Sequence, residues 1–329
     1  MTAAAVALLA GTVAAPAAVP VPDMYKSVAS VHWVVKDLDV VKQAWTKLGF
    51  PAVQDFGEVA LTVKRRGRPE QARVRAAMTL LPGLAVYWIQ PIEGASAYTE
   101  LLARHGDGVF SLNHQAQSAA ALEAEVARLE RLGIGVLQRT EVETGSGTLT
   151  IVHMDTAAEG KYVLGLVYGT VPGADAAAPP PPFPAKLSQF AFVVRDPRAV
   201  SAFWSRLGLP EMDFTRPTIS ERLYRGAPTE FDQELGWQRH GAVTYEWIRS
   251  LAGPSVYDDF LKAHGEGLHH LAFAVDDLDK ALAVWKASGF AAVQSGSWGE
   301  KGKPGSGRYA YVDTEPAGGV YLELLWNQR

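Results

Sequence analysis

Residues 30–49 read SVHWVVKDLDVVKQAWTKLG, and residues 189–208 read QFAFVVRDPRAVSAFWSRLG. The two stretches align without a gap, and Trp204 follows Trp45 by 159 positions. Other identical residues keep this spacing, namely Asp37 and Asp196, Gly67 and Gly226, Trp88 and Trp247, and His105 and His264. Self-similarity at a fixed spacing is the sequence signature of a repeated architecture. The chain is therefore predicted to be a tandem duplication of two related halves.

Each half divides again into two units of the same kind. Residues 30–35 are short, β-branched and aromatic, which predicts a strand. Asp37 then acts as an N-cap for a helix with apolar residues at helical spacing, which Gly49 ends. Strand-like runs such as 59–63 and 84–90 follow. The unit is therefore predicted to be βαβββ.

This βαβββ order begins three more times along the chain. The later units start at Val109, Ser188 and His270. Their helices are predicted over 118–132, between Pro197 and Gly208, and over 277–288, each followed by a glycine. The predicted fold class is α+β, with four βαβββ units paired into two eight-stranded domains.

Composition gives the domain boundaries and excludes several classes of protein. Residues 28–168 and 187–329 are predicted to be domains, joined by a linker over 169–186 whose run of prolines fits neither a helix nor a sheet interior. Lys plus Arg number 31 against 35 Asp plus Glu, which argues against a nucleic-acid partner. With no cysteine, thiolate metal sites and disulfides are excluded. No long apolar run follows the N-terminus, so no membrane partner is expected.

Residues 1–27 are predicted to be an Ala-rich leader or tail. Residues 1–22 resemble the apolar and cleavage regions of a signal peptide, but the first basic residue is Lys26. Localisation therefore stays open between cytoplasmic and exported.

Four polar residues interrupt the apolar pattern of strands in the second half. Gln189 and His270 open strands at matching positions of the two paired units, and Glu246 and Glu323 lie inside strands at matching positions. Pairing the units brings the four residues to one point. Two carboxylates, an imidazole and an amide oxygen form a hard donor set for a divalent cation with open positions. Of the adjacent His269 and His270, the alignment of HLAFAV with QFAFVV selects His270.

The paired βαβββ units of both halves, about residues 28–168 and 187–327, resemble the vicinal oxygen chelate superfamily. This superfamily includes glyoxalase I, methylmalonyl-CoA epimerase, extradiol dioxygenases and antibiotic-resistance proteins. The stretch from Glu246-Trp-Ile-Arg-Ser through His264-Gly-Glu-Gly-Leu-His-His-Leu-Ala-Phe-Ala-Val is similar to the centre of epimerase-type members. The resemblance implies two glyoxalase/bleomycin-resistance/dioxygenase-type domains. It also implies that Gln189, Glu246, His270 and Glu323 bind Zn, Ni, Co, Mn or Fe.

The first half departs from the superfamily at all four ligand positions. The matching residues are Ser30, Tyr87, Ser111 and Gly165, which are poor divalent ligands. The first domain is therefore predicted to have lost its metal site. His32 and His114 leave open a displaced site.

The resemblance implies that Glu246 or Glu323 detaches from the metal and acts as the catalytic base. We therefore expect a metal-dependent isomerase or lyase acting by proton abstraction on a small molecule, as a monomer or homodimer. An extradiol-type dioxygenase is an alternative, although Gln189 stands where such enzymes have His. A non-catalytic small-molecule-binding protein is a second alternative. The glycine-rich segment 295–308 is either a mobile lid or a long hairpin connection, and its Lys301, Lys303 and Arg308 could meet an anionic substrate.

Overall fold

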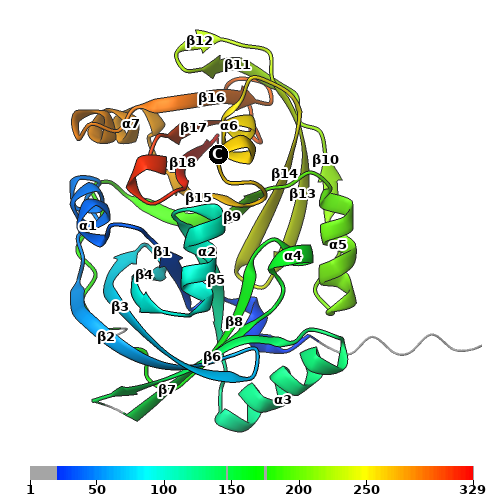
Figure 1. Ribbon diagram of the computed structural model, residues 1–329. Coiled ribbons are helices and arrows are strands. Elements are labelled where there is room, and N and C mark those ends of the chain that lie inside the picture. The colour runs from blue at the N-terminus through cyan, green and yellow to red at the C-terminus, as the bar shows by residue number, and fades with distance from the viewer. Residues whose placement is uncertain (1–20, 146, 174–175, 329) are drawn as a thin grey trace, which may run out of the picture.

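The computed structural model describes residues 21–145, 147–173 and 176–328. Eight strands of the first half form a closed barrel, called the first barrel, in the order β1-β4-β3-β2-β6-β7-β8-β5 (lower part of Figure 1). These strands are β1 (Ser30–Val34), β2 (Gln54–Arg65), β3 (Arg68–Leu81), β4 (Leu84–Gly94), β5 (Gly108–Gln115), β6 (Val136–Thr144), β7 (Gly147–Met154) and β8 (Val163–Tyr168). Its helical elements are η1 (Asp23–Lys26), α1 (Leu38–Lys47), α2 (Ala97–His105), α3 (Ala119–Arg131) and α4 (Ala157–Gly160).

The second half forms one sheet, called the second sheet, in the order β10-β13-β14-β9-β15-β18-β17-β16-β11-β12. Its strands are β9 (Ala185–Val193), β10 (Asp213–Thr215), β11 (Ile219–Tyr224), β12 (Ala227–Pro228), β13 (Asp232–His240), β14 (Val243–Ala252), β15 (Gly267–Val275), β16 (Ala292–Trp298), β17 (Gly307–Val312) and β18 (Tyr321–Asn327). Its helical elements are α5 (Pro197–Arg206), α6 (Val256–Ala263), α7 (Leu278–Ala287) and η2 (Glu315–Ala317). The predicted α+β class with paired βαβββ units is confirmed.

The second sheet has ten strands where eight were predicted, because two long strands are interrupted. β10 and β11 take the place of the continuous β2, and β12 and β13 take the place of β3. Pro217 lies between β10 and β11, and a proline offers no N–H to a sheet. β10 pairs with β13 whereas β11 pairs with β16, so the sheet opens between β10 and β11. Thr215, Pro217 and Ile219 at this opening line the cavity described below.

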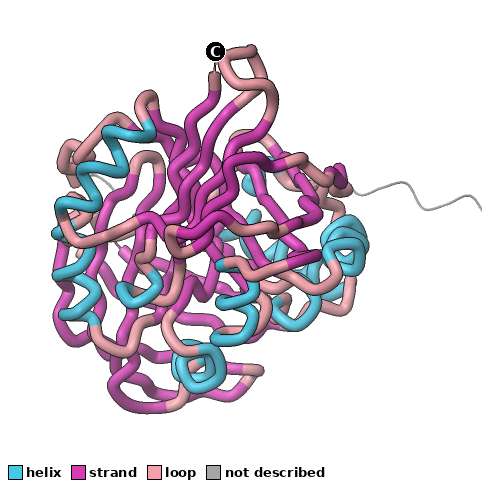
Figure 2. Tube along the Cα trace, turned by 90° about the horizontal axis from the view of Figure 1, so that it is seen from above, coloured by secondary structure: helices cyan, strands magenta, loops and turns pink. Residues whose placement is uncertain are grey.

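The predicted helix starts and ends are confirmed. The Asp37 carboxylate accepts hydrogen bonds from the backbone N–H groups of Asp39 and Val40, and Asp196 caps α5 in the same way. Gly49 follows α1 with φ of 91°, a backbone conformation in which glycine has no Cβ penalty. These local signals place each helix between its strands, on the outside of the sheets (Figure 2).

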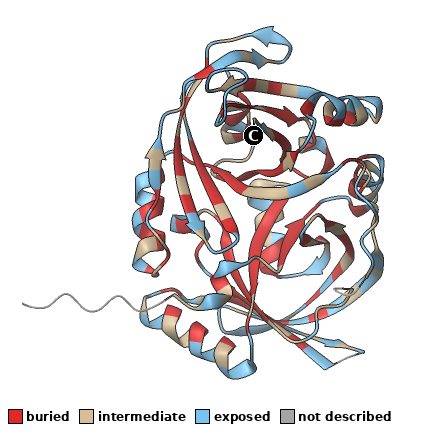
Figure 3. Ribbon diagram, turned by 180° about the vertical axis from the view of Figure 1, so that it is seen from behind, coloured by how far each residue is buried: buried red, intermediate tan, exposed pale blue. Residues whose placement is uncertain are grey.

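The two halves share one hydrophobic core. The repeat-related Trp45 and Trp204 each donate an indole N–H to the opposite half. Trp45 Nε1 lies 3.0 Å from the Ala317 carbonyl oxygen, and Trp204 Nε1 lies 3.2 Å from that of Gly160. Buried residues follow the strands through the middle of the molecule (Figure 3). The duplication therefore produces pseudo-twofold contacts between the halves.

Two predicted boundaries need correction. The leader or tail was predicted to extend to residue 27, yet Tyr25 is buried and its hydroxyl donates to Glu125. Val21 and Met24 also pack against the core, so this segment belongs to the folded body. The predicted linker over 169–186 ends earlier, because β9 begins at Ala185, directly after the last proline, and pairs with β15. The signal-like residues 1–20 lie outside the described residues. Among the described residues, no helix has the length and apolar character needed to cross a membrane.

His264 lies between the two halves, and its hydrogen bonds indicate that the stability of the protein depends on pH. Its Nε2 lies 2.8 Å from Glu315 Oε1, and its Nδ1 lies 2.9 Å from the His105 carbonyl oxygen. The hydrogen bond to Glu315 raises the pKa of His264, because only the imidazolium donates from both nitrogens. The same contact lowers the pKa of Glu315.

We therefore expect His264→Gln to lower the free energy of unfolding by on the order of 1 kcal/mol at pH 6. A histidine whose pKa is raised by folding contributes its full stabilisation of the folded state at pH values below its unfolded pKa of about 6.5. This contribution disappears as the pH rises through the folded pKa. Denaturant unfolding of wild type and variant at pH 6 and pH 9 measures the difference. Glu315→Gln is the matched partner variant. If His264→Gln lowers the free energy of unfolding equally at pH 6 and pH 9, the raised pKa of His264 is not the cause of the loss.

Candidate metal centre

The four predicted ligand residues lie on four neighbouring strands of the second sheet. Glu246 lies on β14, Gln189 on β9, His270 on β15 and Glu323 on β18, and these strands are adjacent in that order. β14 runs parallel to β9, and β18 runs parallel to β15. Each parallel pair therefore contributes two of the four residues. Gln189 and His270 were predicted to open their strands, but they lie inside β9 and β15, because both strands begin several residues earlier.

The register explains why the side chains share a face. Ala191 pairs with both Glu246 and His270, and Ala272 pairs with both Gln189 and Glu323. Alternate residues of a strand point to the same face, so the two small alanines lie between the four polar residues. Alanine at these positions leaves space above the sheet for a bound group.

Three of the four residues form a compact buried cluster. One ligand atom each from Glu246, His270 and Glu323 lies within 4.8 Å of the other two. His270 Nε2 is 3.1 Å from Glu323 Oε2 and 3.5 Å from Glu246 Oε2. These three atoms and Gln189 Oε1 are buried and have no hydrogen-bond partner. Buried groups of this kind are costly unless something pairs with them, and a divalent cation fits the donor set.

The charges of the cluster shift the pKa values of its members. Burial raises the pKa of Glu246, and the nearby Glu323 carboxylate adds to this effect. Burial lowers the pKa of His270, but the two carboxylates outweigh it and raise the pKa to about 9. Two carboxylates around one imidazole thus make a strongly cation-attracting point in the interior.

His269 forms a hydrogen bond with the His270 ring, a contact that the sequence pattern did not predict. β15 carries a bulge here, and His269 Nδ1 lies 2.8 Å from His270 Nδ1. Burial keeps the pKa of His269 well below its usual value, so its ring is neutral. The ring of Tyr321 stacks on it with centroids 4.8 Å apart. The contact with His269 fixes the orientation of the His270 ring, as a hydrogen bond to the remote nitrogen of a His side chain does.

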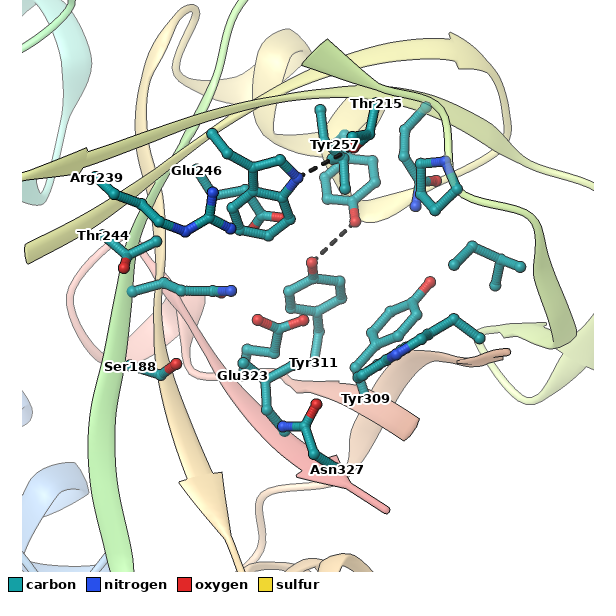
Figure 4. A pocket seen from close by; sticks show the side chains of 18 residues that line it. Ser188, Thr215, Arg239, Thr244, Glu246, Tyr257, Tyr309, Tyr311, Glu323 and Asn327 are labelled. Carbon is teal, nitrogen blue, oxygen red and sulfur yellow. Dashed lines mark hydrogen bonds between the residues drawn. The ribbon is translucent and has the colours of Figure 1, made fainter. Parts of the chain in front are cut away.

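The cluster lies in a cavity of about 500 Å³. Tyr257 and Tyr311 share a hydrogen bond of 2.8 Å between their hydroxyl groups on one side of the cavity (Figure 4). On another side Arg239 packs over the ring of Trp237, 5.2 Å from the centroid. Among the described residues Arg239 has no ion-pair partner. Its guanidinium is therefore available to an anionic group of a ligand.

Trp298 and Tyr309 also line the cavity, together with aliphatic and polar side chains. Segment 295–308, predicted as a lid or a hairpin connection, contributes the ends of β16 and β17 and a turn over 299–306. Arg308, which was expected to be able to meet an anionic substrate, forms an ion pair with Asp279 at 2.9 Å.

Hydrogen bonds fill the matching region of the first barrel. Ser111 Oγ lies 2.8 Å from Asn113 Oδ1, and Asn113 Nδ2 donates to Ser30 Oγ at 3.2 Å. A Cβ at Gly165 would lie 1.9 Å from Asn113 Oδ1, so a larger side chain at this position would displace the Asn113 amide from its hydrogen bonds.

His32 and His114, the residues of the possible displaced site, do not come together with a third ligand. His32 Nδ1 lies 3.2 Å from the Tyr98 hydroxyl, and His114 Nδ1 lies 2.7 Å from the Ser27 carbonyl oxygen. Within residues 21–145, 147–173 and 176–328, the cluster of Glu246, His270 and Glu323 is the only one of its kind.

The structure is a two-domain α+β fold built from two barrel-like sheets of paired βαβββ units, and the second sheet borders a polar cavity. Residues 188–311 match the family described as the Glyoxalase/Bleomycin resistance protein/Dioxygenase superfamily. No curated protein sequence matches the chain significantly. The chain has the fold of the vicinal oxygen chelate superfamily in a two-domain arrangement.

Solved structures with the same fold are distant in sequence. A triple mutant of 4-hydroxymandelate synthase from Streptomyces coelicolor superimposes with a TM-score of 0.62 at 16% identity, covering 92% of each chain. A xylose isomerase-like TIM barrel/4-hydroxyphenylpyruvate dioxygenase fusion protein gives a TM-score of 0.54 at 12% identity, over 92% of this chain and 49% of that one. A Mn(II)-bound glyoxalase from Novosphingobium aromaticivorans gives 0.48 at 16% identity, over 92% of this chain and 83% of that one.

Proposed function

We propose that the protein is a metal-dependent enzyme of the glyoxalase or epimerase type. In this proposal it is an isomerase or lyase that removes a proton next to a metal-chelated carbonyl of a small molecule. The observation that carries the proposal is the convergence of two buried carboxylates and an imidazole beside an accessible cavity, where each carboxylate keeps one oxygen without a hydrogen-bond partner.

The donor set suits a divalent cation such as Mn, Co, Ni, Zn or Fe(II). Glu246, His270 and Glu323 would hold it, with Gln189 Oε1 as a fourth ligand. When bound, the metal would polarise a substrate oxygen as a Lewis acid and stabilise the negative charge that follows proton loss. His269 would keep His270 in the orientation that ligation requires.

Proton transfer is assigned to one of the two glutamates. A general base must reach the proton within hydrogen-bond distance. Glu246 and Glu323 both border the cavity, and each has an unpartnered carboxylate oxygen. Trp298 and Tyr309 would cover part of a bound substrate, and Arg239 would orient its anionic part.

Metal analysis together with a substrate screen tests this function. We expect the purified protein to contain a divalent metal by plasma mass spectrometry, and chelation to abolish turnover of a 2-oxoaldehyde thiohemiacetal or an acyl-CoA epimer. Readdition of the same metal should restore the turnover. Iron with oxygen uptake would instead support the dioxygenase alternative, and ligand binding without any metal would support the binding protein.

The dioxygenase alternative draws on two of the structural neighbours, whose names refer to 4-hydroxymandelate synthase and to 4-hydroxyphenylpyruvate dioxygenase. Their similarity concerns the fold. Gln189 disfavours the alternative, because the resemblance implies His at this position of an Fe(II) site with two His and one carboxylate. We therefore retain proton abstraction as the proposed reaction.

A further inference from the structure

The first barrel contains a cavity of its own, of about 120 Å³. None of its lining residues is Asp, Glu, Lys or Arg. Most of the wall is aliphatic, from Val59, Leu61, Val74, Ile89, Leu149 and Ile151. An apolar wall without any charged side chain disfavours an ionic ligand, because such a ligand would lose its hydration without compensation. The cavity therefore suits an uncharged molecule.

Aromatic side chains border the same cavity. The rings of Phe56 and Tyr87 lie nearly parallel, with an interplanar angle of 22° and centroids 6.4 Å apart. The Tyr87 hydroxyl donates to the Pro172 carbonyl oxygen at 2.8 Å, which holds Val171 and Pro172 against the cavity. A cavity of about 150 Å³ lined by apolar residues can hold one benzene ring. The volume here is thus close to that of a single six-membered ring.

One polar atom in the cavity wall lacks a partner. His32 is 6% exposed and lines the cavity, and its Nδ1 lies 3.2 Å from the Tyr98 hydroxyl. Among the described residues its Nε2 has no hydrogen-bond partner. Burial lowers the pKa of His32 to about 4, so the ring is neutral. In a neutral imidazole one ring nitrogen donates a hydrogen bond and the other accepts one. Nε2 can therefore pair with a hydroxyl group of a ligand, which both donates and accepts.

We propose that the first barrel is a second ligand site, which binds an uncharged aromatic alcohol of the size of phenol. The ring occupies the apolar cavity and the hydroxyl pairs with His32 Nε2. Two of the four positions that correspond to metal ligands, Ser30 and Tyr87, line this cavity. The cavity thus lies beside the position that corresponds to the metal centre, which hydrogen bonds of Ser30, Ser111 and Asn113 fill. This inference is independent of the function proposed for the second half.

Titration calorimetry of the full-length protein with phenol tests the site. We expect one saturable site with a dissociation constant on the order of 1 mM, which is modest for a ligand of seven heavy atoms. Ala76→Phe fills the cavity and should abolish the binding. His270→Ala removes a predicted metal ligand in the second half and should leave phenol affinity unchanged. Thermal unfolding of both variants shows whether each remains folded.

His32→Phe supplies a second, smaller change in the same cavity. It keeps a ring but removes the polar nitrogen, so phenol affinity should fall by about 3-fold to 10-fold. Benzene, which has no hydroxyl, should bind this variant at least as well as wild type. Absence of saturable phenol binding up to about ten times the expected constant would overturn the proposal. So would binding that survives Ala76→Phe but disappears in His270→Ala, because phenol would then occupy the cavity of the second half.

Discussion

His270→Ala is expected to remove the metal from the protein. The substitution deletes the one imidazole of the cluster, whose Nε2 lies between the two carboxylates. Changes to groups that merely support a ligand already cost about 10-fold to 100-fold in metal affinity, so loss of the ligand itself should cost at least about 100-fold. Metal content by plasma mass spectrometry after dialysis measures the effect. Loss of the metal-dependent rise in melting temperature gives an independent readout.

The duplication provides a matched control for this experiment. Ser111 occupies in the first barrel the position that His270 occupies in the second sheet, and its hydroxyl belongs to a hydrogen-bonded network. Ser111→Ala should therefore leave the metal content unchanged. Equal metal loss in the two variants would show that the metal does not reside at the proposed centre.

Glu246→Gln or Glu323→Gln is expected to separate metal binding from proton transfer. Glutamine keeps the size of the side chain and one ligating oxygen, but it loses the charge and the basicity. A general base typically contributes about 10²-fold to 10⁴-fold to the rate. At least one of the two variants should therefore retain substantial metal and lose turnover by a factor in this range. Metal content and turnover, measured on the same preparation, decide which glutamate is the base.

Gln189→Glu serves as the comparison for the two glutamate variants. Gln189 has no proposed role in proton transfer, so its replacement should reduce activity less. A third carboxylate should hold the metal more firmly and weaken its pull on substrate oxygens. If both Glu→Gln variants keep metal and full activity, proton abstraction is not the reaction, and an oxygenase or binding role must replace it.

Much of the candidate centre could be predicted because its signal is a break in a local pattern. Glu246 and Glu323 interrupt apolar strands, and the duplication places them at equivalent positions. The alignment of HLAFAV with QFAFVV separated His270 from His269. The role of His269 was not predictable, because its contact with His270 depends on a bulge that β15 forms against β9. Arg239 was also missed, since an exposed arginine on a strand carries no signal until the cavity beside it is known.

The sequence by itself determined the duplication, the βαβββ order, the helix limits at Asp37 and Gly49, and the identity of the polar strand residues. Each of these depends on the spacing of residues within one segment or on a comparison of two segments. Only the tertiary structure decided where strands break, how Trp45 reaches the opposite half, and that Tyr25 belongs to the core. It also decided that hydrogen bonds fill the metal position of the first barrel. These features arise from contacts between residues far apart in the chain, whose partners no local periodicity encodes.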